Sequence, residues 1–278
     1  MMIEIRPVTT IEQCRQIGEI ESAAWGADEV TPDHILLAIA QQKGAVLLAY
    51  DGKLPVGFCV SFVSFGGSSS NATGFRLKHH SHMAAVLPSH QGRGIAQQIK
   101  WAQRDFVLEQ GIDWMTWTFD PLETRNGRLN IYKLGAVCCR YERDLYGAQV
   151  DELNMGIATD RFEVDWWLAS LRVQAHRARQ SANEMSTTKT WVVNQVSVVD
   201  GIRPERIQHD LFGRYDRLLV AVPTDFQAIK RVDLIQAVAW RKHTREIFET
   251  AFAQNYTVID LLMGERLCHY VLIRDWRP

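Results

Sequence analysis

The chain has 278 residues, a formal net charge of −1 at pH 7 and five cysteines. This length allows one large domain or two modest ones, and the balanced charge gives no support for nucleic acid or an anionic membrane surface as a partner. No apolar run is long enough to cross a membrane, and scattered cysteines in odd number suit a reducing compartment, so we expect a cytoplasmic protein without a signal peptide.

Apolar periodicity predicts the elements of the first half of the chain. In chain order they are a strand at 3–8, a helix at 11–25 capped by Thr10, a helix at 31–42, strands at 45–50 and 54–65, a strand at 80–87, a helix at 95–110, a strand at 112–119, a helix at 122–134 and a strand at 136–145. The glycine-rich stretch at 66–74 is expected to be a loop.

The second half has a less regular pattern. We expect a strand from 161 passing into a helix that ends near 180, a polar loop at 181–190, strands at 191–199 and 217–222, a helix at 232–254 and a closing hairpin at 257–263 and 269–273. Residues 101–119 and 240–262 both run from an amphipathic helix into an apolar strand. Either a degenerate internal repeat or an ordinary αβ unit explains this similarity.

A glycine turn separates the strand at 80–87 from the following helix. Gly92 and Gly94 let the backbone approach an anion, the helix start offers unpaired N–H groups, and Arg93 adds a positive charge. A P-loop is excluded because no Lys-Ser or Lys-Thr follows, and a Rossmann fingerprint because Gln97 stands at the third glycine position. A plain tight connection between strand and helix is the open alternative.

The pattern Gln91-x-x-Gly94-x-Ala96, directly after a strand that ends in Val86-x-Pro88, resembles the acyl-coenzyme A loop of the GNAT (Gcn5-related N-acetyltransferase) superfamily. The predicted element order up to about residue 148 is similar to that of the superfamily. The resemblance implies an α/β fold with a mixed, mostly antiparallel sheet flanked by helices over residues 1–150. A C-terminal α/β extension, which could be a degenerate GNAT-like half, would occupy residues 151–278.

GNAT enzymes transfer an acyl group directly from acyl-coenzyme A to an amine, so the resemblance implies a coenzyme A site. The implied cofactor-binding residues are Ala84, Ala85 and Val86 for the pantetheine arm, Gln91, Gly92, Arg93, Gly94, Ile95 and Ala96 for the pyrophosphate, and Asn126 for a further contact. The strand carrying Ala84 to Val86 would also provide an oxyanion contact. No metal is expected.

His80 and His82 are the candidates for removing the proton of the acceptor amine. They alternate along the strand with Ala84 and Val86, so we expect both rings on the side that those residues face. Histidine titrates at a pKa of about 6.5 and can accept a proton near neutrality. The pair is similar to the paired histidines of arylalkylamine N-acetyltransferases, with His82 nearer the reacting centre. Histidines at the surface or core edge are the alternative.

Candidates for protonating the thiolate are less well placed. Many GNAT enzymes have a tyrosine four residues before the glycine that ends the late helix, where this chain has Ile131, and Tyr132 follows one position later. A one-residue offset turns a helical side chain by about 100°. Tyr141 is a second candidate. Asp120 and Glu123 could order a water or the amine, or form a turn and helix cap.

These observations predict an acyl-coenzyme A-dependent N-acyltransferase that acts on the amine of a small metabolite, such as an amino acid, in a ternary complex. Acetyl is the default acyl group and succinyl the larger alternative. A coenzyme A-binding protein without catalysis, in a regulatory or structural role, is the competing hypothesis, supported by the displaced tyrosine. The expected partner is a small molecule, not nucleic acid or membrane, and homodimer formation stays open.

Overall fold

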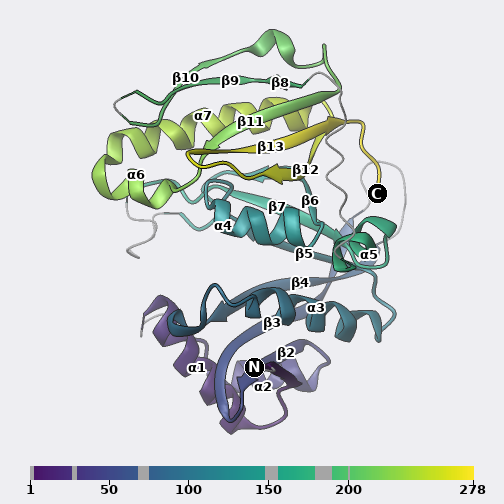
Figure 1. Ribbon diagram of the computed structural model, residues 1–278. Coiled ribbons are helices and arrows are strands. Elements are labelled where there is room, and N and C mark those ends of the chain that lie inside the picture. Colours follow the sequence, from purple (N-terminus) through teal and green to yellow (C-terminus); the bar gives the residue numbers. More distant parts are fainter. Residues whose placement is uncertain (1–2, 27–29, 68–74, 148–155, 179–189, 200) are drawn as a thin grey trace. The chain divides into compact units, whose positions relative to one another are not determined.

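The computed structural model describes residues 3–26, 30–67, 75–147, 156–178, 190–199 and 201–278 (Figure 1). The chain forms two compact units. Unit 1 comprises Met1–Trp117 and Trp167–Ala169, and unit 2 comprises Thr118–Trp166 and Ser170–Pro278. The domain boundary expected at residue 150 falls in 148–155, outside the described residues.

Unit 1 follows the predicted order of strands and helices. It contains β1 (Ile3–Pro7), α1 (Ile11–Trp25), α2 (Asp33–Gln41), β2 (Ala45–Asp51), β3 (Leu54–Gly67), β4 (Phe75–Val86), α3 (Ile95–Leu108) and most of β5 (Trp114–Phe119). Its strands lie in the order β1-β2-β3-β4-β5. Neighbouring strands from β1 to β4 are antiparallel, and β5 runs parallel to β4. The strand order and the pairing position the glycine turn directly between β4 and α3.

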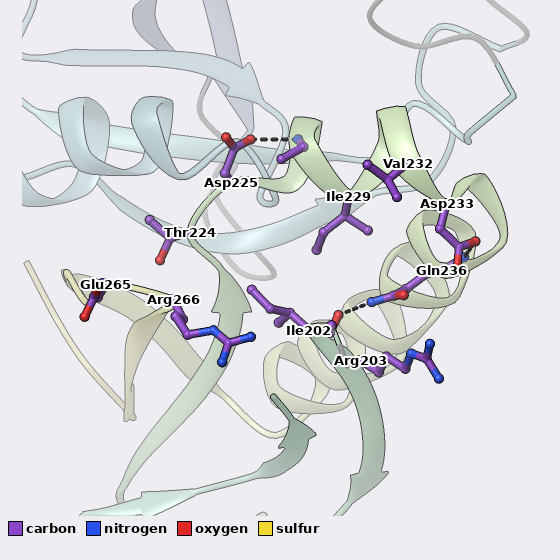
Figure 2. Close-up of a pocket in the computed structure, with 12 residues that line it drawn as sticks. Ile202, Arg203, Thr224, Asp225, Ile229, Val232, Asp233, Gln236, Glu265 and Arg266 are labelled. Carbon is purple, nitrogen blue, oxygen red and sulfur yellow. Dashed lines mark hydrogen bonds between the residues drawn. The ribbon is translucent and has the colours of Figure 1, made fainter. Parts of the chain in front are cut away.

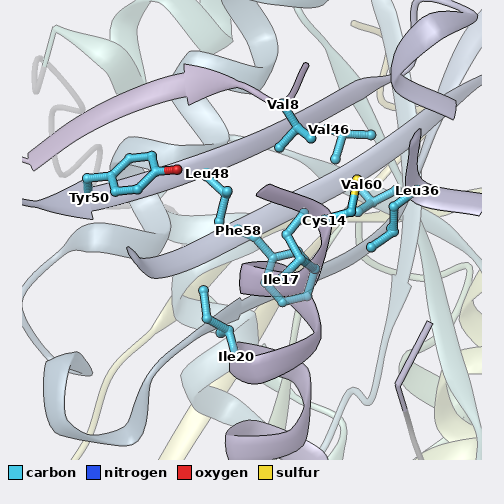
Figure 3. Packing of buried hydrophobic residues seen from close by; sticks show 10 residues of the cluster. All are labelled: Val8, Cys14, Ile17, Ile20, Leu36, Val46, Leu48, Tyr50, Phe58 and Val60. Carbon is cyan, nitrogen blue, oxygen red and sulfur yellow. The ribbon is translucent and has the colours of Figure 1, made fainter. Parts of the chain in front are cut away.

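Helices cover both faces of the unit 1 sheet. On one face α1 and α2 pack over a buried cluster (Figure 3), which consists of Val8, Cys14, Ile17, Ile20, Leu36, Val46, Leu48, Tyr50, Phe58 and Val60. On the opposite face α3 packs closely, because a Cβ at Gly57 of β3 would lie 2.9 Å from Ile99 Cδ1. The alternation of side chains along each strand therefore divides unit 1 into an α1 face and an α3 face.

The start of α1 confirms the predicted cap. Gln13 N donates to Thr10 Oγ1 at 3.3 Å, and Thr10 N donates to Gln13 Oε1 at 3.1 Å. This reciprocal pair satisfies two backbone donors that the helix itself leaves without partners.

Unit 2 contains the remaining elements. They are the end of β5, α4 (Thr124–Gly127), a π-helix η3 (Arg128–Lys133), β6 (Val137–Glu142), β7 (Arg161–Trp167), α5 (Leu171–Arg177), β8 (Trp191–Val192), β9 (Asn194–Ser197), β10 (Arg203–Ile207), β11 (Arg217–Pro223), α6 (Phe226–Val232), α7 (Leu234–Ala253), β12 (Tyr256–Leu262) and β13 (Leu267–Arg274). The sheet order is β7-β6-β12-β13-β11-β8, while β9 pairs with β10 in a separate ribbon. All pairs in that sheet except β11 with β8 are antiparallel.

The mixed, mostly antiparallel α/β architecture is confirmed, and several boundaries differ from the prediction. The helix expected at 122–134 is divided into α4 and the π-helix. The helix expected from 232 begins later, because Asp233 caps α7 by accepting from Gln236 N at 3.0 Å. Helix α6 and strand β10 were not predicted. Gly66 and Gly67 belong to β3, and 68–74 lie outside the described residues. No helix in the described part of the chain is long and apolar enough to cross a membrane.

Candidate functional site

A β-bulge interrupts β4 at His82. The register pairs Val60 with Met83 and Ser61 with Ser81, so His82 is the extra residue on β4. Such a bulge reverses the alternation of side chains beyond it, and bulges next to functional sites often re-aim a side chain. The histidines and the residues after the bulge therefore do not share one alternation of side chains.

His80 and His82 come together beside an aromatic ring. Their ring centroids are 6.2 Å apart, and those of Phe62 lie 5.5 Å from His80 and 6.1 Å from His82. His80 Nδ1 lies 3.5 Å from Thr116 Oγ1 of β5. His82 is exposed and His80 half-buried, so the two rings and Phe62 form an accessible cluster.

The expectation that His80, His82, Ala84 and Val86 share one face is wrong. Val86 packs with Ile99 next to Gly57, which places it on the α3 face, whereas His80 alternates with Ser81, a residue that faces α3. The bulge accounts for the error, because one inserted residue moves everything after it to the other face.

The glycine turn leaves space for an anion. Gly92 and Gly94 both have a φ of +79°, and a Cβ at either position would meet no atom within 4 Å. Gly94 is the N-cap of α3 and provides no side-chain cap. The first N–H groups of a helix have no partner within it, so those of Ile95 and Ala96 suit an acceptor such as a phosphate oxygen. Exposed Arg93 adds charge.

The end of β4 is held at the start of this turn. Gln91 Nε2 donates to Val86 O at 3.2 Å, which ties the turn to the strand. One edge of β4 from Ala84 to Val86 pairs with β3. Among the described residues, the register of β4 with β5 consists of two pairs, His79 with Met115 and His80 with Thr116. Beyond His80 the second edge of β4 is thus the place where an extended ligand could bond to the backbone.

His79 is a core residue and does not join the candidate site. Its Nδ1 lies 3.0 Å from Ser61 Oγ and its Nε2 lies 3.2 Å from Gln110 Oε1, and the side chain is fully buried. Burial lowers the pKa of His79, against the opposing effect of the Gln110 contact. The ring connects β3 with the segment that follows α3.

A buried lysine lies on the α3 face and was missed by the sequence patterns. Lys100 is 5% exposed, and its Nζ donates to Gln103 Oε1 at 2.8 Å and to Ser81 Oγ at 3.0 Å. The same atom lies 3.9 Å from the centroid of the Trp117 ring. Burial lowers the pKa of Lys100 from 10.5 to about 7. In sequence, a lysine on an amphipathic helix is read as a solvent-facing residue.

This lysine should give the stability of the protein a specific pH dependence. Between pH 7 and 10.5 the unfolded chain binds a proton at Lys100 that the folded chain does not, so the free energy of unfolding should rise with pH across that window. Lys100→Met should remove this rise, and Lys53→Met, at an exposed turn position, should keep it. Chemical denaturation in steps across the window measures both, and parallel curves for wild type and Lys100→Met would contradict the assignment.

Tyr132 and Asn126 both belong to unit 2. Tyr132 lies in the π-helix, half-buried, and its carbonyl oxygen lies 2.8 Å from His176 Nδ1. Asn126 is exposed on the four-residue α4. Tyr141 donates to Asp160 Oδ2 at 2.8 Å, and burial together with that carboxylate raises its pKa. A tyrosine so bound is suited to a structural role.

At Asp120 the structure contains a turn, which was one of the two alternatives expected from the sequence. Asp120 Oδ1 accepts from Leu122 N at 2.8 Å and from Arg241 Nη1 at 2.8 Å. Glu123 Oε1 accepts from Gln227 Nε2 at 2.6 Å, and burial raises the pKa of Glu123. In the described residues, no group of three or more His, Cys, Asp or Glu side chains could hold a metal ion.

Unit 2 also has an open pocket of about 450 Å³ (Figure 2), which contains no residue predicted to be functional. Ile202, Ile229 and Val232 form an apolar side. Its carboxylates serve the helices, because Asp225 accepts from Ala228 N at 2.8 Å and Asp233 caps α7. These two aspartates are thus engaged in the fold, whereas Arg203, Glu265 and Arg266 line the pocket as exposed residues. The sequence had no signal for this pocket.

No protein-family model matches the sequence, and no curated protein matches it either. Solved structures do. The ribosomal-protein-S18-alanine N-acetyltransferase from Escherichia coli is 12% identical with a TM-score of 0.48, and the alignment covers 61% of this chain and 96% of that one. The structure of yncA from Salmonella typhimurium, solved with acetyl-CoA, is 20% identical with a TM-score of 0.47. The alignment covers 61% of this chain and 96% of that one.

An acetyltransferase of the GNAT family from Streptococcus pneumoniae is 10% identical with a TM-score of 0.46, over 59% of this chain and 98% of that one. With TM-scores below 0.5 and identities below 25%, this likeness by itself assigns neither activity nor substrate.

Proposed function

We propose that the protein is a GNAT-type N-acyltransferase that uses acyl-coenzyme A to acylate the amine of a small metabolite, with acetyl as the default group. One observation carries the proposal. Strand β4 separates from β5 beyond His80 and leads through the left-handed glycines 92 and 94 into the uncapped start of α3. This arrangement offers an anion site at the turn and, next to it, the edge of β4 beyond its described pairing with β5.

The glycine turn suits the pyrophosphate of coenzyme A. Backbone N–H groups from Gln91 to Ala96 would hold it, because the turn has room where a side chain would stand and the helix dipole favours negative charge. The Arg93 guanidinium would add attraction from the surface. Fixing the pyrophosphate here would direct the rest of the molecule along the adjacent strand.

The edge of β4 suits the pantetheine arm and the acyl carbonyl. The backbone groups of Ala84, Ala85 and Val86 would bond to the amide groups of the arm in the manner of an added strand. A backbone N–H next to the bulge at His82 would stabilise the negative charge that develops on the carbonyl oxygen. The bound acyl-coenzyme A supplies the activated thioester, and the protein supplies its alignment.

His82 would accept the proton that the acceptor ammonium must lose before it attacks. The ring is exposed next to Phe62 and His80, so an amine can reach it from solvent. Direct attack on the thioester then requires both substrates to be bound together. Tyr132 stays a second candidate for proton transfer, with its role to be tested by substitution.

Thiol release is the experiment that tests the function. Acetyl- and succinyl-coenzyme A should each be assayed against a panel of amino acids and arylalkylamines, with coenzyme A binding measured in parallel by calorimetry. Turnover with one acceptor class supports the proposal. Binding without turnover across the panel would favour a non-catalytic coenzyme A-binding protein, and absence of binding would refute both.

Gly94→Ala should weaken coenzyme A binding by about tenfold, or roughly 1.4 kcal/mol, because the new methyl group stands where the phosphate is proposed. The left-handed backbone adds a stability cost of about 1–2 kcal/mol. Gly52→Ala is the matched control, since its φ is +62° and a Cβ there also meets nothing within 4 Å. It should lose similar stability and keep full affinity. Calorimetry and thermal unfolding separate the two effects.

A further inference from the structure

Lys100 lies at the point where β4 and β5 separate. Its Nζ contacts Ser81 of β4 and Trp117 of β5, at 3.0 Å and 3.9 Å. Each of these residues is one position beyond the last described pair, His80 with Thr116. The amine therefore lies next to the strand edge at which the proposed function, on which this inference rests, places the reacting end of the acyl-coenzyme A.

The surroundings of Lys100 are suited to a sulphur atom. Met115 Sδ lies 3.9 Å from Nζ, and the aromatic face of Trp117 lies next to it. Cys59 of β3 is fully buried in the same region, where its charge state affects that of Lys100. These soft, polarisable groups provide favourable contacts for the sulphur of a thiol.

A buried hydrogen-bond donor next to Lys100 has no acceptor. Ser81 Oγ donates to Gln103 Oε1 at 3.2 Å, and Lys100 donates to the same oxygen, whereas Gln103 Nε2 is buried without a hydrogen-bond partner. Gln103 is fully buried. A buried amide donor of this kind destabilises the fold until an acceptor is supplied. A ligand atom with a lone pair would supply it.

The other titratable groups on this face are neutral or engaged elsewhere. Burial raises the pKa of Cys59 to about 12, and burial lowers that of His79. Arg104 of α3 donates to Leu168 O at 2.8 Å and forms an ion pair with Asp105 at 3.0 Å. Among these four described side chains of the α3 face, Lys100 is therefore the one whose charge can change near neutral pH.

We propose that Lys100 is a catalytic residue of the acyl transfer, which contacts the sulphur of coenzyme A and gives it a proton as the thiolate leaves. An ammonium there also stabilises the negative charge on sulphur. This role is the one for which the sequence offered the displaced Tyr132.

The proton and electron balance is simple. The acceptor ammonium first loses one proton to His82, and the neutral nitrogen forms the new C–N bond. The C–S bond breaks, its electron pair goes to sulphur, and sulphur takes a proton from Lys100. The nitrogen releases its second proton, which restores the charge of Lys100 through water, and His82 passes the first to solvent. Burial brings the pKa of Lys100 to about 7, below the value of about 8.5 for an ordinary thiol, so transfer to the thiolate is favourable.

The test is the ionisation of bound coenzyme A, which needs no acceptor. The ultraviolet absorbance of the thiolate is titrated against pH for coenzyme A, free and bound to the full-length protein. We expect the pKa of the bound thiol to be at least one unit lower in the wild type than in Lys100→Met, because the amine donates a hydrogen bond to the thiolate. Lys100→Arg and the control Lys53→Met should keep the wild-type value. Desulfo-coenzyme A should bind wild type and Lys100→Met equally.

Each outcome has one meaning. Equal pKa values of the bound thiol in the wild type and in Lys100→Met overturn the assignment of Lys100 and leave the proposed function intact. Lys100→Gln provides the same comparison if Lys100→Met does not fold. Failure of the wild type to bind coenzyme A refutes the proposed function itself.

Discussion

Arg241→Met is expected to lower the free energy of unfolding by about 3–5 kcal/mol, because it leaves a buried carboxylate without its counter-charge. Arg241 is 3% exposed and bonds to both carboxylate oxygens of Asp120, which is itself 9% exposed. Burial disfavours the charged guanidinium, but Asp120 outweighs this effect and raises the pKa of Arg241. Arg161 Nη1, at 3.8 Å, is too distant to replace the lost hydrogen bonds.

Two further variants give this prediction its controls. Asp120→Asn in the Arg241→Met background removes the stranded charge and keeps an acceptor for Leu122 N, so it should recover a large part of the loss. Arg143→Met breaks an ion pair with Glu249 whose side chains are 62% and 30% exposed, and it should cost less than about 1 kcal/mol. Urea denaturation measures all three. Equal losses for Arg241→Met and Arg143→Met would show that burial of the pair does not matter.

His82→Ala is expected to lower the rate of acyl transfer by about a hundredfold, the smaller end of what a positioned general base contributes. The loss should appear in kcat, while the affinity for coenzyme A stays unchanged. Thiol release between pH 6 and 9 with a productive acceptor is the measurement. His80→Ala, next to His82 and in contact range of Thr116, should have a smaller effect.

His34→Ala provides the comparison for this prediction, because His34 is exposed on α2 of the same unit. It should leave the rate within twofold of the wild type. Equal rates for His82→Ala and wild type at every pH would exclude His82 as the base and leave His80 as the remaining histidine candidate.

The elements that local physics determines were predicted well. Thr10 begins α1 through a capping box with Gln13, and left-handed Gly92 and Gly94 form the turn before α3. In these cases one or two residues decide the backbone locally. Helix α6 was missed although Asp225 caps it, because seven residues carry too little apolar periodicity to be distinguished from a loop.

Features that depend on distant strands could not be predicted. The bulge at His82 exists only in the pairing of β4 with β3, and no pattern within β4 indicates an extra residue. The burial of Lys100 likewise results from the way α3 lies over Ser81 and Trp117. The sequence thus indicated which strand and turn to consider, while the faces to which their side chains point came from tertiary structure.

Unit 1 is completed by a segment that arrives late. Trp167 stacks on Trp114 with centroids 5.2 Å apart, and Leu168 N donates to Asp113 O at 2.8 Å. During synthesis on the ribosome, Trp167–Ala169 are added 50 residues after the first 117 residues of unit 1. Unit 1 must therefore wait for part of unit 2 to be translated before its last contacts can form. A recombinant fragment cut at residue 150 would lack them permanently, so expression trials should extend at least to Ala169.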